Sequence, residues 1–273
     1  MNARIVVGVD GSPGALRAVR WGAAEAAHRR APLLLVNGFG IPDAFYGEAV
    51  PPRDWLDVHR ERSLAWLREA AHAAADEHPA LDIDTESSLD SPIPLLLRRS
   101  EDAAMMVLGS AGRGVLGDLV VGSCATALSA HSRCPVAVVR GRVPVPSGDG
   151  PVVVGVDGGP ANEPALLLAF EEASWRGASL VAVHATAGAP ETLELAEALG
   201  EWEKKFPETT VRWVVEDAHA RQQLLAWSAT ARLLVVGTRG RGGFPGLRLG
   251  STSHALLHHA ECPVLFVPGP DEH

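Results

Sequence analysis

The chain has 273 residues, 47% of them hydrophobic, and a formal net charge of −9 at pH 7. This acidic balance excludes nucleic acid and anionic membrane surfaces as general partners, because both repel negative charge. The sequence has no apolar run of about 20 residues, no signal peptide and too few cysteines for a disulfide framework, so we expect a soluble cytoplasmic protein.

The first half alternates short apolar segments with helical ones. Strands are predicted near residues 5–9, 33–36, 81–86, 105–108 and 135–139, and helices over 15–30, 55–78, 92–101 and 123–132. The strand segments are continuously apolar, which is typical of parallel strands that are covered on both faces. Five such strands alternating with four helices indicate a doubly wound α/β domain.

The second half repeats the first. The segment Ile5–Gly11 returns as Val152–Gly158, 147 residues later, and further strands are predicted near 180–183, 211–215, 233–236 and 264–267. We therefore predict two tandem domains, 1–143 and 151–273, joined by a Pro- and Gly-rich linker, 144–150. Each domain is expected to hold a five-stranded parallel sheet of order 3-2-1-4-5 with helices on both faces.

The two halves differ in length after their second strands. The closing motif Cys-Pro-Val recurs with a shift of only 128, from Cys134 to Cys262, so the second half is 147 − 128 = 19 residues shorter inside. The surplus falls in a long Gly/Pro-containing loop of the first half, Gly38–Arg53. This segment is either a lid over a site or a variable surface loop.

An acidic residue ends the first strand of each half, at Asp10 and at Asp157. Ligands of open α/β sheets bind at the carboxyl ends of strands where the strand order reverses, and here the first and fourth strands flank that point. Each aspartate is either a ligand for a ribose or a base, or the polar partner of the turn that follows it. The residues alone leave both interpretations open.

A spaced glycine motif follows each fourth strand. Gly109-Ser-Ala-Gly112, nine residues and Gly122-Ser123 recur as Gly237-Thr-Arg-Gly240, nine residues and Gly250-Ser251. Such a loop exposes backbone N–H groups, and the helix that opens beside it adds its own free N–H groups, so the pattern predicts a phosphate site. Tight-turn geometry for the glycines and helix N-capping for Ser123 and Ser251 are the alternatives.

Other nucleotide motifs do not fit. Gly112-Arg-Gly-Val-Leu-Gly117 matches the dinucleotide fingerprint but follows a fourth strand, and Pro245 breaks the second copy. The chain contains no GxxxxGK[ST] motif, which disfavours a Walker-type NTPase. Arg113, Arg239, Arg241 and Arg248 are candidates for facing phosphates in place of a lysine.

Histidines and cysteines form no repeated constellation. His254 and His258 are four residues apart but lack a third zinc ligand, and the first copy has Thr126 in place of His254. Cys134 and Cys262 are expected to pack as small hydrophobic side chains. We therefore assign no metal site and no catalytic residue.

The paired motifs resemble the ATP-binding class of the universal stress proteins. The resemblance rests on Val-Gly-Val-Asp at each first strand together with the spaced glycines, and it covers nearly the whole chain as a tandem two-domain form. It implies one ATP per domain, with Mg²⁺ as a candidate companion ion, and a regulatory role in stress response. With the neighbouring loop residues, the expected site residues are Asp10, Val36, Gly109, Gly112, Arg113, Gly114, Gly122, Ser123 and Cys124 in the first domain, and Asp157, Val183, Gly237, Gly240, Arg241, Gly242, Gly250, Ser251 and Thr252 in the second.

Two further functions stay open at this point: an enzyme that slowly hydrolyses or transfers from a nucleotide, and a scaffold with empty sites. We expect binding rather than catalysis, because no general base recurs in both halves. The second site should bind more tightly, because Thr252 replaces Cys124 and Arg239 replaces Ala111. The resemblance also implies packing between the two domains, and we expect a homodimer of chains.

Overall fold

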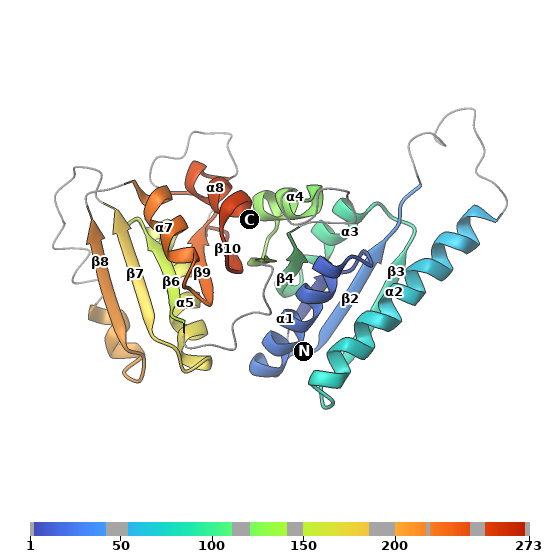
Figure 1. The fold of residues 1–273 in the computed structure, drawn as a ribbon, viewed down its shortest axis with the longest axis horizontal. Coiled ribbons are helices and arrows are strands. Elements are labelled where there is room, and N and C mark those ends of the chain that lie inside the picture. The colour runs from blue at the N-terminus through green and yellow to red at the C-terminus, as the bar shows by residue number, and fades with distance from the viewer. Residues whose placement is uncertain are drawn as a thin grey trace. The chain divides into compact units, whose positions relative to one another are not determined.

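The chain divides into two compact units, Met1–Val139 and Arg140–His273, each built on parallel strands (Figure 1). The computed structural model describes residues 3–41, 54–110, 121–140, 150–185, 200–216, 219–240 and 249–270. The expected linker lies outside these ranges except for Gly150, and so does most of the expected long loop. The predicted domain bounds therefore stay a prediction.

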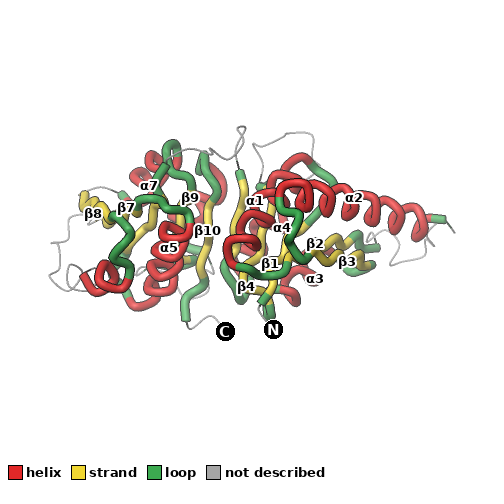
Figure 2. The backbone as a smooth tube through the Cα atoms, turned by 90° about the horizontal axis from the view of Figure 1, so that it is seen from below, coloured by secondary structure: helices red, strands yellow, loops and turns green. Residues whose placement is uncertain are grey.

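The first unit is a doubly wound α/β domain. Its strands are β1 (Arg4–Gly8), β2 (Leu33–Gly38), β3 (Ile83–Ser88), β4 (Ala103–Gly109) and β5 (Val136–Val139). Its helices are α1 (Pro13–Arg29), α2 (Trp55–Glu77), α3 (Pro92–Arg99) and α4 (Ser123–His131). The strands run parallel in the order β3-β2-β1-β4-β5. Helix α1 packs on α2 and α3 on α4, and Figure 2 shows α2 and α3 on opposite sides of β2 and β3.

The second unit repeats this architecture. Its strands are β6 (Val152–Val156), β7 (Leu180–Ala185), β8 (Val211–Glu216), β9 (Leu233–Gly237) and β10 (Val264–Val267). Its helical elements are the short 3₁₀ turn η3 (Pro160–Asn162), α5 (Glu163–Trp175), α7 (Ala220–Ser228) and α8 (Ser251–His259), and residues 200–205 are also helical. The parallel order β8-β7-β6-β9-β10 confirms the predicted 3-2-1-4-5 arrangement in both domains.

Local sequence explains where the first helix begins and ends. Ser12 caps the start of α1, since its Oγ accepts a hydrogen bond from the N–H of Ala15 at 3.1 Å, and Pro13 occupies the first turn. Arg30 closes the helix in the left-handed conformation, with a φ of 51°. No helix in the described ranges combines the length and hydrophobicity that a membrane crossing requires.

One polar contact of the first domain recurs in the second domain between residues that lie 128 positions later in the chain. Ser100 Oγ donates to the carbonyl of Leu97 at 2.7 Å and accepts from the N–H of Arg133 at 3.2 Å. Ser228 repeats both bonds, to Leu225 at 2.7 Å and from Glu261 at 3.1 Å. The contact joins the end of α3 or α7 to the segment that leads into the last strand.

A buried ion pair recurs on the first long helix of each domain. The Glu25 side chain is fully buried and pairs with Arg29, whose side chain is 14% exposed. Glu172 and Arg176 repeat the pair 147 residues later, with exposures of 0% and 13%. Each buried carboxylate needs its arginine, because an unpaired charge in a protein interior strongly lowers the stability of the fold.

We predict that Glu25→Ala lowers the free energy of unfolding by about 3–5 kcal/mol, because Arg29 then loses its carboxylate in a buried environment. Urea unfolding followed by circular dichroism measures the loss. The double change Glu25→Met with Arg29→Met should cost less than the single change, since it removes both charges.

The matched control is Asp84→Ala, which breaks an exposed pair, Arg4–Asp84, joined at 3.1 Å. That loss should stay within about 1 kcal/mol. Equal losses of unfolding free energy for Glu25→Ala and Asp84→Ala would show that burial does not determine how much the Glu25–Arg29 pair contributes to stability.

Candidate functional site

A pocket opens at the carboxyl ends of the central strands of the first domain. Its volume is about 220 Å³. Its walls come from the ends of β1, β2 and β4, from the start of α3 and from the start of α4. The lining residues predicted from the sequence are Asp10, Val36, Gly109, Gly122, Ser123 and Cys124.

The second domain has a corresponding pocket of about 450 Å³. The predicted residues that line it are Asp157, Val183, Gly237, Gly240, Gly250, Ser251 and Thr252. Arg239, considered above as a phosphate ligand, also lines it. The remaining predicted residues, Gly112, Arg113, Gly114, Arg241 and Gly242, lie outside the described residues. Every predicted site residue that the structure describes thus lies in one of the two pockets.

The two aspartates organise the turn after the first strand and also face the pocket. Asp10 Oδ1 accepts from the N–H of Ser12 at 2.9 Å, and Asp157 Oδ1 accepts from the N–H of Gly159 at 2.7 Å. The intervening glycines, Gly11 and Gly158, have φ angles of 75° and 73°, which favour glycine. Neither Oδ2 atom accepts a hydrogen bond from the described residues, so in each aspartate one oxygen holds the turn and the other can bind a ligand.

One backbone hydrogen bond closes the glycine-containing loop of each domain. The N–H of Gly122 donates to the carbonyl of Ser110 at 2.8 Å, and that of Gly250 donates to Thr238 at 2.7 Å. Each bond joins the end of the fourth strand to the residue before the next helix. The loop therefore leaves and rejoins the sheet at one point beside the pocket.

The glycines of the motif are present for different reasons. A Cβ on Gly109 would lie 2.7 Å from the carbonyl carbon of Gly14, so this glycine is needed for the close approach of α1. Among the described residues, a Cβ on Gly240 would meet only Asp157 Oδ2, at an ordinary contact distance of 3.5 Å, and Gly240 has no left-handed φ. The fold thus explains Gly109 but does not require Gly240.

The serines that follow the loop do not cap their helices. Helix α4 begins at Ser123 with Gly122 in the cap position, α8 begins at Ser251 with Gly250 there, and neither cap makes a side-chain bond. The N-capping alternative is therefore wrong for both serines. Their hydroxyl groups are exposed at the pocket, beside the free N–H groups of the first helical turn.

Several pocket residues were not predicted from the sequence. Asn162 is buried in the second domain, where its Oδ1 accepts from the N–H of Asp157 at 3.3 Å and its Nδ2 donates to the carbonyl of Gly155 at 3.1 Å. Ser253 Oγ donates to the carbonyl of Gly237 at 2.7 Å. The corresponding residues of the first copy are alanines, so no repeated pattern signals them. Other unpredicted lining residues include Ser12, Asn37, Pro92 and Leu96 in the first domain and Ala220 and Leu224 in the second.

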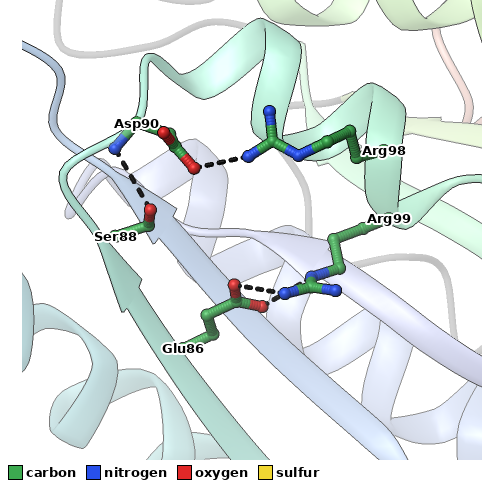
Figure 3. Close-up of polar contacts among 5 residues, drawn as sticks. All are labelled: Glu86, Ser88, Asp90, Arg98 and Arg99. Atoms are coloured by element: carbon green, nitrogen blue, oxygen red, sulfur yellow. Dashed lines mark hydrogen bonds and ion pairs between the residues drawn. The ribbon is translucent and has the colours of Figure 1, made fainter.

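Two charged pairs connect helix α3, which forms one wall of the first pocket, to strand β3 and to the turn between them. Figure 3 shows Arg98 of α3 paired with Asp90, whose N–H donates to Ser88 Oγ at 3.1 Å. Arg99 forms a two-pronged pair with Glu86 of β3, at 2.8 and 2.6 Å (Figure 3). These contacts link α3, which carries the pocket residues Pro92 and Leu96, to β3 and to the turn between them.

The cysteines differ in accessibility. Burial raises the pKa of Cys134 to about 11 and that of Cys262 to about 12, which confirms that both pack as small hydrophobic side chains. Cys124 is half-buried in the first pocket. Burial and then the charge of Asp10 raise the pKa of Cys124, and a hydrogen bond with Ser123 opposes them. The first pocket therefore presents a neutral thiol where the second presents the hydroxyl of Thr252.

The histidines of α8 contact one another outside the second pocket. The rings of His254 and His258 lie 4.6 Å apart between centroids. Burial, followed by the nearby His254, His259 and Arg140, lowers the pKa of His258. The described part of the chain contains no group of three or more His, Cys, Asp or Glu side chains arranged to hold a metal ion.

The fold and the pockets together define a tandem α/β protein with one ligand-sized pocket at the switch point of each sheet. A family model, the universal stress protein family, matches residues 1–140 and 186–268. The chain is 36% identical over 282 residues to a universal stress protein of Mycobacterium tuberculosis strain H37Rv, covering 96% of this chain and 95% of that relative. It is 33% identical over 306 residues to one of Mycobacterium bovis, covering 99% and 96%. This chain belongs to the universal stress protein family.

Solved structures agree in fold. The structure of a universal stress protein from Archaeoglobus fulgidus DSM 4304 matches with a TM-score of 0.74, covering 97% of this chain and 98% of that one, at 17% identity. A protein of Pseudomonas aeruginosa PAO1 described as functionally unknown matches with a TM-score of 0.68, covering 98% and 93%, at 18% identity. The fold is thus shared over nearly the whole chain.

We predict that Cys124 is the thiol that iodoacetamide modifies first in the native protein, and that Asp10→Asn speeds the reaction at pH 8. The charge of Asp10 raises the pKa of Cys124, so its removal lowers that pKa and increases the reactive thiolate fraction. Mass spectrometry of the labelled peptides measures the rate.

Cys134 and Cys262 serve as internal controls, since burial should keep both unreactive until the protein unfolds. An unchanged rate at Cys124 in Asp10→Asn would contradict the electrostatic contact between the two residues.

Proposed function

We propose that each domain binds one ATP and that the chain acts as a nucleotide-dependent regulator in stress response, with little or no hydrolysis. The observation that supports this most directly is the convergence of two motifs in one pocket. The aspartate after the first strand and the glycine–helix motif after the fourth line the same pocket, in both domains. The resemblance to the ATP-binding class assigns adenosine to the first motif, and ribose and phosphates to the second.

The chemistry of the pocket walls suits the two ends of a nucleotide. Around Gly122 and Ser123 the wall offers free N–H groups and the positive end of the α4 dipole, which favour phosphate. At the opposite side, Val36 and Leu96 provide an apolar wall for a base. In the second domain Ser251 and Gly250 supply the phosphate end and Val183 the base end.

A magnesium ion fits this arrangement only as a companion of the phosphates. Mg²⁺ commonly takes one or two protein carboxylates together with phosphate oxygens and water. The described part of each pocket offers one carboxylate, from Asp10 or from Asp157. When bound, Mg²⁺ would neutralise phosphate charge while the aspartate holds it or the ribose.

The rival function is nucleotide hydrolysis or transfer. Phosphoryl transfer needs a group that positions or activates the nucleophile. In the described pockets the aspartate is the side chain best able to act as a base, and one of its oxygens is already committed to the turn. Binding without rapid turnover is therefore the function that the geometry favours.

We expect purified protein to release an adenine nucleotide on denaturation and to bind two ATP molecules per chain in calorimetric titration. The second site should be the tighter by about tenfold, because Arg239 can form a charge-assisted bond with phosphate. Gly240→Val should abolish the tighter phase, because Gly240 lines the pocket beside Asp157 and the added side chain would fill space that the ligand needs, without straining the backbone.

The matched change is Gly112→Val in the first domain, which should abolish the weaker phase. If the Gly240 variant kept the tighter phase, the ranking of the sites would be wrong. If neither variant altered the stoichiometry, the sites would lie elsewhere.

Clean protein should hydrolyse ATP slowly or not at all, because the described residues of each pocket offer no base other than the aspartate that also holds the turn. A coupled phosphate-release assay under multiple-turnover conditions measures this. Robust turnover that disappears in Asp157→Ala would replace the binding proposal with the enzymatic one.

A further inference from the structure

The turn that carries the aspartate is held differently in the two domains. In the first domain Ser12 lies two residues after Asp10, and its Oγ accepts a hydrogen bond from the N–H of Ala15 at 3.1 Å. The counterpart of Ser12, 147 residues later, is Gly159, which has no side chain and cannot form this bond. The turn of the second domain is therefore held by other contacts.

Asn162, the counterpart of Ala15, supplies these contacts. Its Oδ1 accepts from the N–H of Asp157 at 3.3 Å, and its Nδ2 donates to the carbonyl of Gly155 at 3.1 Å. Its own N–H donates to the carbonyl of Gly159 at 3.0 Å. A backbone N–H only donates and a carbonyl only accepts, so the two side-chain partners determine the direction of the amide. The side chain of Asn162 thus bridges the end of β6 and the residue that follows it.

This bridge is buried and leads directly to the carboxylate of the pocket. Asn162 is only 3% exposed and lines the second pocket together with Asp157. The N–H of Gly159 binds Asp157 Oδ1 at 2.7 Å, so the backbone and the side chain of Asp157 are both held. A group that is fixed before the ligand arrives loses less conformational freedom on binding, which favours affinity.

We infer that Asn162 is a positioning residue of the second site, which acts through Asp157 and fixes the direction in which that carboxylate meets the nucleotide. This inference rests on the proposed function. The contact is indirect, because both polar atoms of the Asn162 side chain bind the backbone. In the first domain the capping bond of Ser12 holds the corresponding turn. The two domains thus fix the same aspartate in two alternative ways.

Asn162→Ala tests the inference in full-length Gly112→Val protein, in which calorimetric titration reports on the second site alone. We expect the ATP affinity to fall about three- to tenfold, because a loosened Asp157 loses part of a charge-assisted hydrogen bond. The loss should not exceed that of Asp157→Ala, since Asn162 acts only through this carboxylate. Alanine is compatible with the turn, because Ala15 occupies the same position in the first domain.

A double-mutant cycle separates positioning from other roles. In the Asp157→Ala background, Asn162→Ala should cause no further loss of ATP affinity, because no carboxylate remains to be positioned. A side chain that touches the ligand itself, or that only stabilises the domain, would change the affinity by the same factor with and without Asp157. That result would overturn the inference.

Gly159→Ser provides a rescue that copies the first domain. Gly159 has φ and ψ angles of −93° and 158°, close to the −83° and 156° of Ser12, and a proline follows both residues. A serine therefore fits there without backbone strain, and its hydroxyl can accept from the N–H of residue 162. Gly159→Ser should restore most of the ATP affinity that Asn162→Ala removes. Gly159→Ala is the matched control and should restore none, so equal affinities of the two variants would contradict the inference.

The outcomes distinguish this inference from the function on which it rests. If the second site binds ATP and Asn162→Ala leaves its affinity unchanged, the inference fails while nucleotide binding stands. Where urea unfolding shows that Asn162→Ala does not fold, Asn162→Ser makes the same comparison, because its short hydroxyl cannot bridge both backbone partners. If the unmodified protein does not bind ATP, the proposed function and the inference both fail.

Discussion

The position of each pocket depends on one backbone hydrogen bond, from Gly122 to Ser110 in the first domain and from Gly250 to Thr238 in the second. The bond fixes the point at which a long glycine-containing loop returns to the sheet. It therefore sets where the next helix starts and where its free N–H groups point. Because β4 lies beside β1, and β9 beside β6, that helix end meets the aspartate of the first strand. The parallel strand order turns two distant motifs into one site.

Duplication has preserved this frame while the pocket walls have diverged. Both domains keep the turn aspartate, the closing bond and the buried glutamate–arginine pair. They differ where a ligand would touch the wall, for example at Cys124 and Thr252. The charged pairs that hold α3 in the first domain are also not repeated, since the counterparts of Arg98 and Arg99 are Ala226 and Trp227. Each domain thus has the same scaffold with its own binding chemistry.

The sequence predicts the strands and helices well because parallel strands buried on both faces are continuous apolar runs. It predicts the pocket because Asp10 and the glycine motif both recur in the second copy. Two interpretations changed with the structure: Asp10 combines the turn and pocket roles, and Ser123 does not cap its helix.

Buried polar residues were harder to predict. Glu25 and Arg29 have the i,i+4 spacing of an ordinary surface pair, and only their repetition 147 residues later hints at burial. Asn37 is a polar residue at a strand end, where exposure is the usual expectation. The direction of its amide depends on the Val9 carbonyl, which the register between β1 and β2 brings near. Such contacts arise from tertiary packing, so local sequence patterns do not contain them.

The contact between Trp66 and Gly11 has a practical consequence for spectroscopy. A Cβ on Gly11 would lie 2.4 Å from the indole of Trp66, so the ring rests directly on the backbone that follows Asp10. The corresponding position of the second copy is Glu194, which is not fluorescent. An indole emission change that vanishes in Trp66→Phe would therefore come from the first domain alone. The protein carries its own optical reporter of movement in the Asp10–Gly11 turn.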